Sequence, residues 1–270
     1  MLTLIRGAGD IASGIALRLY RAGFSVVMTE TERPTTIRRT VAFSDAVVKG
    51  EQTVEDITAF RADTWEDALC FLNQKNIPVL VDPDCISRKH LHPDVLVDAI
   101  LAKRNLGTKI TDAPIVIGIG PGFTAGADCH AVVETMRGHT LGRVYYEGSA
   151  LPNTNIPGLI GGFAGERVLR APADGVFIGA HRIGDYVESG ETVGFVEGQP
   201  MKATISGTLR GLLVDGVPVK KGMKSGDVDP RGERGYCDLV SDKAFSIGGG
   251  VLEAILHFEA EKYGKRSETH

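Results

Sequence analysis

A glycine-rich turn near the N-terminus is the first segment of this sequence with the residue types for ligand binding. Gly7, Gly9 and Ala12 fit the pattern G-x-G-x-x-A. The turn follows a short apolar run and opens a stretch with helical spacing. Glycines let the main chain approach a ligand, and the N-terminus of the next helix presents free N–H groups to an anion. Asp10 would cap this helix but repel a pyrophosphate.

An acidic residue completes the arrangement. Glu30 ends the next strand-like run, 21 positions after Gly9, where dinucleotide-binding turns carry the acid that meets a ribose. We therefore predict a nucleotide-type site formed by Gly7, Gly9, Asp10, Ala12 and Glu30. The alternative is a tight turn in a Rossmann-like scaffold. Arg38 and Arg39 would either meet a phosphate of the ligand or lie on a solvated helix face.

A second glycine-rich segment covers residues 118–126. It follows a fully apolar run at 115–119, which predicts a buried strand. Ligands bind where the ends of parallel strands gather at one edge of a sheet. Gly120, Gly122 and Phe123 are therefore expected to join the first loop in one site. The alternative is a turn that leaves the domain.

A third group of candidates lies near the C-terminus. Cys237 has Arg231, Arg234 and Lys243 near it in sequence, and such cations stabilise a nucleophilic thiolate. Cys237, Asp229 and Arg231 are the candidate catalytic residues; the alternative for the cysteine is a small buried residue. Too few carboxylates are clustered to predict a metal site. The four scattered cysteines argue against a disulfide framework and a structural zinc site.

The elements around these residues predict an α/β protein with a second, all-β part. Residues 1–127 are expected to form a Rossmann-like α/β domain, with strands at 54–61 and 79–81 and helices at 64–73 and 94–104. Residues 128–170 read as a connector with two strands, and residues 231–270 as a glycine-rich loop followed by a helix. In that last segment, residues 248–250 are expected to form a turn that opens the helix.

An internal repeat defines the all-β part, residues 171–230. Residues 171–175 align with 203–207, and the same offset of 32 joins Gly184 to Gly216 and Gly190 to Gly222. Two copies packed together would bury one core. The pattern resembles a duplicated barrel-sandwich hybrid of the lipoyl/biotinyl type, in which a hairpin lysine carries the cofactor. Lys202 is the nearest lysine here; the alternative is a surface lysine at a strand edge.

Composition limits the class of partner. The chain has 270 residues, a net charge of −4 and 43% hydrophobic residues, which is ordinary for a globular protein. Nucleic acid and anionic membranes are therefore not expected as partners. No apolar stretch approaches the roughly 20 residues of a membrane span, and no signal segment is evident. These features predict a cytoplasmic protein.

Seven separate stretches of the chain carry a family likeness: residues 6–16, 37–43, 120–126, 134–139, 227–231, 241–244 and 248–253. They resemble the YqeB-type family of the selenium-dependent molybdenum hydroxylase system. The resemblance implies a role in maturing a molybdenum hydroxylase that carries labile selenium, with that hydroxylase as partner. The family is distantly similar to XdhC-type maturation factors, which combine a Rossmann-like domain with handling of the molybdenum cofactor. The candidate ligand is then a molybdopterin cofactor or a dinucleotide.

Three functions remain open at this point. The first is a maturation factor that binds a nucleotide-like or molybdopterin-type ligand, with Cys237 handling sulfur or selenium. The second is an NAD(P)-dependent oxidoreductase, although no proton-relay constellation is evident. The third is a non-catalytic scaffold whose repeat domain docks a partner. The sequence does not decide whether the protein is an enzyme.

Overall fold

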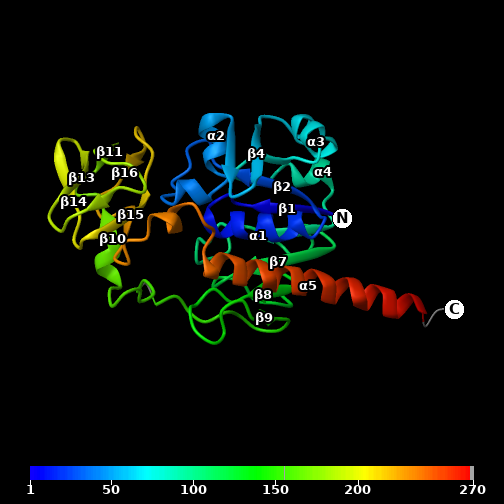
Figure 1. Ribbon diagram of the computed structural model, residues 1–270. Coiled ribbons are helices and arrows are strands. Elements are labelled where there is room, and N and C mark those ends of the chain that lie inside the picture. Colours follow the sequence, from blue (N-terminus) through cyan, green and yellow to red (C-terminus); the bar gives the residue numbers. More distant parts are fainter. Residues whose placement is uncertain (155, 268–270) are drawn as a thin grey trace.

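The computed structural model describes residues 1–154 and 156–267 and shows two domains side by side (Figure 1). Within these residues, the large domain is built on nine strands in the order β3-β4-β5-β2-β1-β6-β7-β8-β9. Neighbours from β4 to β8 run parallel, whereas β3 and β9 pair antiparallel at the two edges. The strands are β1 (Leu2–Arg6), β2 (Ser25–Glu30), β3 (Glu51–Val54), β4 (Ile57–Ala62), β5 (Ile77–Val81), β6 (Val95–Asp98), β7 (Ile115–Ile119), β8 (Ala131–Val133) and β9 (Val144–Tyr145).

Both faces of this sheet are buried. Successive strand residues point to opposite faces, so in β1 Ile5 packs into one core and Leu4 into the other. Helices α1 (Asp10–Arg21), α2 (Asp45–Lys49) and α5 (Asp242–Ser267) contribute to the first core, and α3 (Trp65–Asn73) and α4 (Arg88–Leu91) to the second. Burial on both sides explains why the central strands are apolar throughout.

Helix α5 runs along α1 and closes the large domain (Figure 1). The two helices approach closely because Gly14 has no side chain: a Cβ there would lie 2.6 Å from the Cβ of Ala244. Gly248, Gly249 and Gly250 lie inside α5 rather than in a turn before it. The predicted turn is therefore wrong: all three glycines are helical, and at Gly248 and Gly250 the neighbouring segments pack too closely for a Cβ.

The β-domain, residues 168–229, forms two four-stranded antiparallel sheets in the described part of the chain, in the orders β10-β17-β15-β12 and β14-β13-β11-β16. The 32-residue offset recurs in the strands, since β11, β12 and β13 begin 32 positions before β15, β16 and β17. The strands are β10 (Val168–Arg170), β11 (Gly175–Gly179), β12 (Tyr186–Val187), β13 (Thr192–Val196), β14 (Gln199–Lys202), β15 (Gly207–Leu212), β16 (Pro218–Val219) and β17 (Lys224–Asp229).

The predicted fold class, a Rossmann-like domain followed by a barrel-sandwich hybrid of the lipoyl type, is wrong. The large domain has a mixed sheet that continues past residue 127 into β8 and β9, and few helices connect its strands. The helix expected at 94–104 is instead strand β6, followed by residues 99–114, which contain no helix. The hairpin between β13 and β14 turns at Glu197 and Gly198, so no lysine occupies its tip; Lys202 pairs with Thr192 at the far end of β14.

One segment of the large domain enters the β-domain. Ile37 is 8% exposed and packs in the core of the β-domain, and its carbonyl oxygen accepts a hydrogen bond from the Leu212 amide at 2.8 Å. Arg38 and Arg39 follow directly and lie at the contact between the domains rather than on a solvated helix face. The two domains are thus joined by main chain, apolar packing and charge together.

Candidate functional site

A cleft of about 750 Å³ lies between the two domains. On the large domain it is lined by the segments that follow β1, β2, β6, β7 and β8, which are the carboxyl ends of parallel strands. On the other side it is lined by residues 156–160, by β10 and by the start of β17, with the start of α5 alongside. The interdomain cleft therefore lies at the sheet edge where ligands of parallel α/β sheets commonly bind.

The first glycine-rich turn opens onto the interdomain cleft. Gly7, Gly9, Asp10, Ala12 and Glu30 all line it. Gly7 has φ +105°, and a Cβ there would lie 3.1 Å from the Ala99 carbonyl oxygen, so the turn requires glycine. The structure thus brings together the five residues predicted from the first motif.

Glu30 is engaged by the turn itself. Its carboxylate accepts hydrogen bonds from the Ala8 amide at 3.0 Å and from the Thr31 amide at 2.8 Å. The acid therefore holds the glycine turn against the end of β2. A ribose hydroxyl could use only the lone pairs that these two main-chain donors leave free.

The second glycine-rich loop contributes less than predicted. Ile119 and Pro121 line the cleft, whereas Gly120, Gly122 and Phe123 are not among its lining residues. Phe123 is buried against Gly118, Gly122 packs against the main chain of Arg104, and Gly120 packs against the side chain of Thr135. The packing of these three residues supports the position of the loop, and the structure does not bring them to the proposed site.

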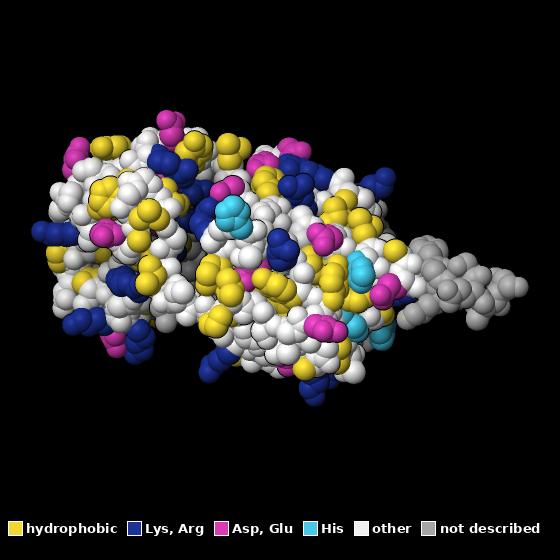
Figure 2. Space-filling view, turned by 90° about the horizontal axis from the view of Figure 1, so that it is seen from below, with side chains coloured by type: hydrophobic (Ala, Val, Ile, Leu, Met, Phe, Trp, Pro, Cys, Tyr) yellow, Lys and Arg dark blue, Asp and Glu magenta, His cyan; other side chains and the backbone are white. Residues whose placement is uncertain are grey.

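The cleft is strongly basic. Among the described residues that line it, eight are Lys or Arg and two are Asp or Glu, although the whole chain carries a net charge of −4. Figure 2 shows Lys and Arg side chains where the β-domain, on the left, meets the rest of the molecule. The basic lining residues are Arg6, Lys103, Arg38, Arg137, Arg167, Arg170, Lys224 and Lys243.

Asp227 organises several of these cations. It is 1% exposed and accepts hydrogen bonds from Arg38 at 2.5 and 3.1 Å and from Arg167 at 3.2 Å. Burial alone would raise the pKa of Asp227, but Arg38, Lys224 and Arg167 outweigh it and hold the pKa below its usual value. Arg38 also lies 3.4 Å from Asp10. This chain of ion pairs links the start of α1 to β17 across the cleft.

The candidate catalytic residues lie in a neighbouring network. Asp229 is buried and binds Arg231 through two hydrogen bonds at 2.9 and 2.6 Å, and Arg210 lies 3.7 Å away. Burial opposes ionisation of Asp229, but the hydrogen bonds from Arg231 lower its pKa. Neither Asp229 nor Arg231 lines the interdomain cleft. Their arrangement is that of a satisfied ion pair.

Cys237 does not have the environment of a reactive thiol. It is 1% exposed, and burial raises its pKa although Arg234 and Arg210 act in the opposite direction. Its thiol faces the Leu209 carbonyl oxygen at 3.9 Å. A raised pKa and poor access both disfavour the thiolate, so the geometry corresponds to the small buried residue that was the alternative.

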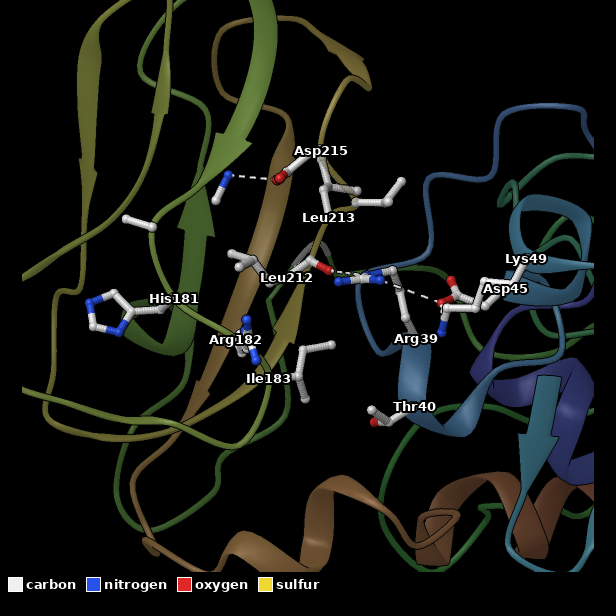
Figure 3. A pocket seen from close by; sticks show the side chains of 13 residues that line it. Arg39, Thr40, Asp45, Lys49, His181, Arg182, Ile183, Leu212, Leu213 and Asp215 are labelled. Carbon is white, nitrogen blue, oxygen red and sulfur yellow. Dashed lines mark hydrogen bonds and ion pairs between the residues drawn. The ribbon is translucent and has the colours of Figure 1, made fainter. Parts of the chain in front are cut away.

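A second cavity, about 540 Å³, lies where α2 meets the β-domain (Figure 3). Arg39 donates a hydrogen bond to the Leu212 carbonyl oxygen at 2.9 Å and lies 3.4 Å from Asp45. Lys49 lies 2.8 Å from the same carboxylate. Because Arg39, Asp45 and Lys49 already have partners, this cavity is a polar contact region between the domains.

The sequence alone does not identify several of the cleft residues as candidate ligand-binding residues. Lys243 had been noted as a neighbour of Cys237, and Arg137 lay within a family-like stretch. Arg167 and Lys224 carried no signal, because their proximity to the glycine turn depends on the whole fold. Within residues 1–154 and 156–267, no group of three or more His, Cys, Asp or Glu is placed to hold a metal ion. No helix in these ranges has the length and apolar character of a membrane span.

Fold and site together define a two-domain protein with a mixed sheet and a basic interdomain cleft. No family model matches the chain. It is 54% identical over 255 residues to YqeB of Escherichia coli (strain K12), in a match that covers 94% of this chain and 47% of the relative. The chain is thus similar over nearly its whole length to part of a YqeB protein. The chain spans about half the length of the curated relative it matches.

Solved structures give a distant likeness. An aspartoacylase family protein from Mesorhizobium loti is 12% identical, with 84% of each chain covered and a TM-score of 0.29. The ectoine utilization protein EutE (DoeB) from Ruegeria pomeroyi is also 12% identical, with 84% of each chain covered and a TM-score of 0.25. TM-scores this low support no statement about activity.

Proposed function

We propose that the interdomain cleft binds an anionic organic ligand of the nucleotide or molybdopterin type. We further propose that the chain thereby acts as an accessory protein in the maturation of a selenium-dependent molybdenum hydroxylase. The binding role is supported by the excess of basic over acidic side chains along the cleft. The maturation role rests on the resemblance to the YqeB-type family alone. Because the chain spans about half of its curated relative, the activity of a whole YqeB protein is part of the proposal.

The volume of the cleft fits a ligand of the nucleotide or molybdopterin type. A volume of about 750 Å³ lies within the usual range of small-molecule sites, roughly 300–1,000 Å³. The glycine turn gives main chain that a ligand can approach, and the first turn of α1 faces the same space. Apolar side chains of Ile100, Leu101 and Ile156 also line the cleft, so the organic part of the ligand has surfaces to pack against.

A dinucleotide is the less favoured of the two ligand types. Both oxygens of Glu30 already accept main-chain hydrogen bonds, which leaves the acid that would bind a ribose fewer free lone pairs. The buried thiol of Cys237 also gives no support for covalent handling of sulfur or selenium. The proposal is therefore a role in binding and delivering a ligand.

The test is native mass spectrometry of the protein co-expressed with the molybdenum and selenium pathways. We expect a retained, phosphorus-containing small molecule, released on denaturation and identified by its fragments. A companion titration with NAD and NADP by calorimetry would detect the dinucleotide alternative. If the protein retains no ligand and binds neither a pterin phosphate nor a dinucleotide, the proposed function is wrong.

A further inference from the structure

The lysines of the interdomain cleft differ from the arginines around them. Arg38 and Arg167 bind Asp227, and Arg137 binds Asp242. The side-chain ammonium groups of Lys103, Lys224 and Lys243, in contrast, form no hydrogen bond or ion pair with any residue in the described part of the chain. All three line the cleft. Lys224 and Lys243 are the two of these that lie close enough to repel each other.

The surroundings of these lysines are unfavourable for a positive charge. Burial among the cleft walls lowers the pKa of Lys224, although Asp227 raises it by more than Arg38 lowers it. Burial also lowers the pKa of Lys243, to which Arg137, Arg38 and Lys224 add repulsion. Asp227 and Asp10 compensate only in part. An anion between the two lysines would offset the cost of burying their charges.

The main chain of each lysine belongs to an element whose neighbouring side chains form ion pairs. Lys224 is the first residue of β17, the strand that carries Asp227 with its two arginine partners. Lys243 follows Asp242, which Arg137 binds through two hydrogen bonds at 2.7 and 2.9 Å. One lysine therefore belongs to the β-domain and the other to the helix that closes the large domain. The main-chain positions of both lysines are therefore set by ordered elements on the two sides of the cleft.

We propose that Lys224 and Lys243 together form a phosphate subsite of the interdomain cleft, which holds a terminal phosphate or diphosphate of the ligand between the two domains. This inference rests on the proposed function and specifies which part of the ligand the β-domain contacts. The first turn of α1 lies along the same cleft and adds main-chain donors to the positive field. Arg38, at 3.4 Å from Asp10, offsets the one acid at the start of that helix.

The test uses inorganic pyrophosphate as the probe, with the intact protein and isothermal titration calorimetry at low and moderate salt. We expect Lys224→Gln and Lys243→Gln each to weaken binding about tenfold, the effect of one charge-assisted hydrogen bond. Lys243→Arg keeps the charge and should retain most of the affinity. Lys221→Gln is the matched control, because this exposed lysine near β17 lies outside the cleft. Circular dichroism and melting curves check that all variants fold.

The outcomes separate this inference from the proposed function. If pyrophosphate binds the unmodified protein and both Gln variants equally well, the subsite is wrong even where a retained organic ligand shows that the cleft is used. If pyrophosphate does not bind at all, the subsite is also wrong. A tenfold loss in both Gln variants, with Lys221→Gln unchanged, supports the subsite whatever the organic part of the ligand proves to be.

Discussion

His130 is the residue through which mild acid should act on the large domain. Its Nδ1 accepts a hydrogen bond from the Val116 amide at 2.9 Å, which requires the neutral ring, and burial lowers its pKa below 6.5. The unfolded chain then binds a proton more readily than the folded one, so stability is lost as the pH falls below about 6.5. We expect the melting temperature to fall between pH 7.5 and pH 5.5.

The contribution of His130 can be isolated by substitution. In His130→Asn the amide oxygen can accept the same hydrogen bond but does not titrate, so the melting temperature should depend less on pH. His139→Asn, which removes an exposed histidine, should keep the pH dependence of the unmodified protein. An unchanged pH dependence in His130→Asn would show that other groups cause the acid sensitivity.

At single positions, the sequence predicts local geometry better than reactivity. Gly7, Gly9 and Glu30 meet at the cleft because one strand–turn–helix–strand unit positions all three, and that unit is contiguous in the chain. Cys237 was judged from cations near it in sequence, but its burial dominates its pKa. Burial depends on residues such as Leu209, which packs from a different strand and cannot be inferred from spacing.

At the scale of elements, two adjacent glycines of α5 should respond in opposite ways to the same substitution, glycine to alanine. No heavy atom of the described residues lies within 4 Å of a Cβ at Gly249, whereas a Cβ at Gly250 would lie 2.2 Å from the Gly142 carbonyl oxygen. Gly249→Ala should stabilise the protein by about 0.5–1 kcal/mol, because alanine favours the helix. Gly250→Ala should destabilise it by about 1–3 kcal/mol through overpacking.

Urea denaturation of the two variants measures both free energies under the same conditions. The comparison is internally controlled, because the substitutions are identical and adjacent in one helix. A loss of stability in Gly249→Ala, or none in Gly250→Ala, would contradict the packing of α5 against the segment around Gly142. The same three-glycine run had predicted a turn, since a glycine selected for close approach looks in sequence like a glycine selected for backbone freedom.

A buried strand was also mispredicted as a helix, because its burial determined the structure more than the sequence pattern did. Val95 and Val97 belong to β6 and are fully buried under the helices of one face, although residues 94–104 had suggested a helix. Short apolar runs do not distinguish a buried strand from a buried helix. The strands of the β-domain were easier to predict, because the 32-residue repeat marks equivalent positions independently of periodicity.

For the whole molecule, the prediction failed where distant parts of the chain meet. The mixed sheet takes in β8 and β9, and α5 returns from the C-terminus to cover α1. Neither event leaves a local signal, since each depends on which faces remain uncovered after the first 127 residues have folded. The interdomain cleft is a product of that assembly, which is why the glycine turn was recognised and the basic wall opposite it was not.

Ile37 should matter more for the contact between the domains than the size of its side chain alone suggests. Its side chain fills the core of the β-domain, while its carbonyl binds the Leu212 amide and the next residue, Arg38, reaches Asp227. Ile37→Ala should cost about 2–5 kcal/mol and should also loosen the contact. We therefore expect faster hydrogen exchange at the Leu212 amide under native conditions.

Met201→Ala provides the comparison, because Met201 is 2% exposed in the same core but lies on β14, in the sheet that does not contain Leu212. It should lower the free energy of unfolding by a similar amount without a selective effect at Leu212. If both variants speed exchange at this amide equally, Ile37 is an ordinary core residue. The two domains would then be held together by the Arg38–Asp227 ion pair and its neighbours, and the geometry of the cleft would depend on charge rather than on packing.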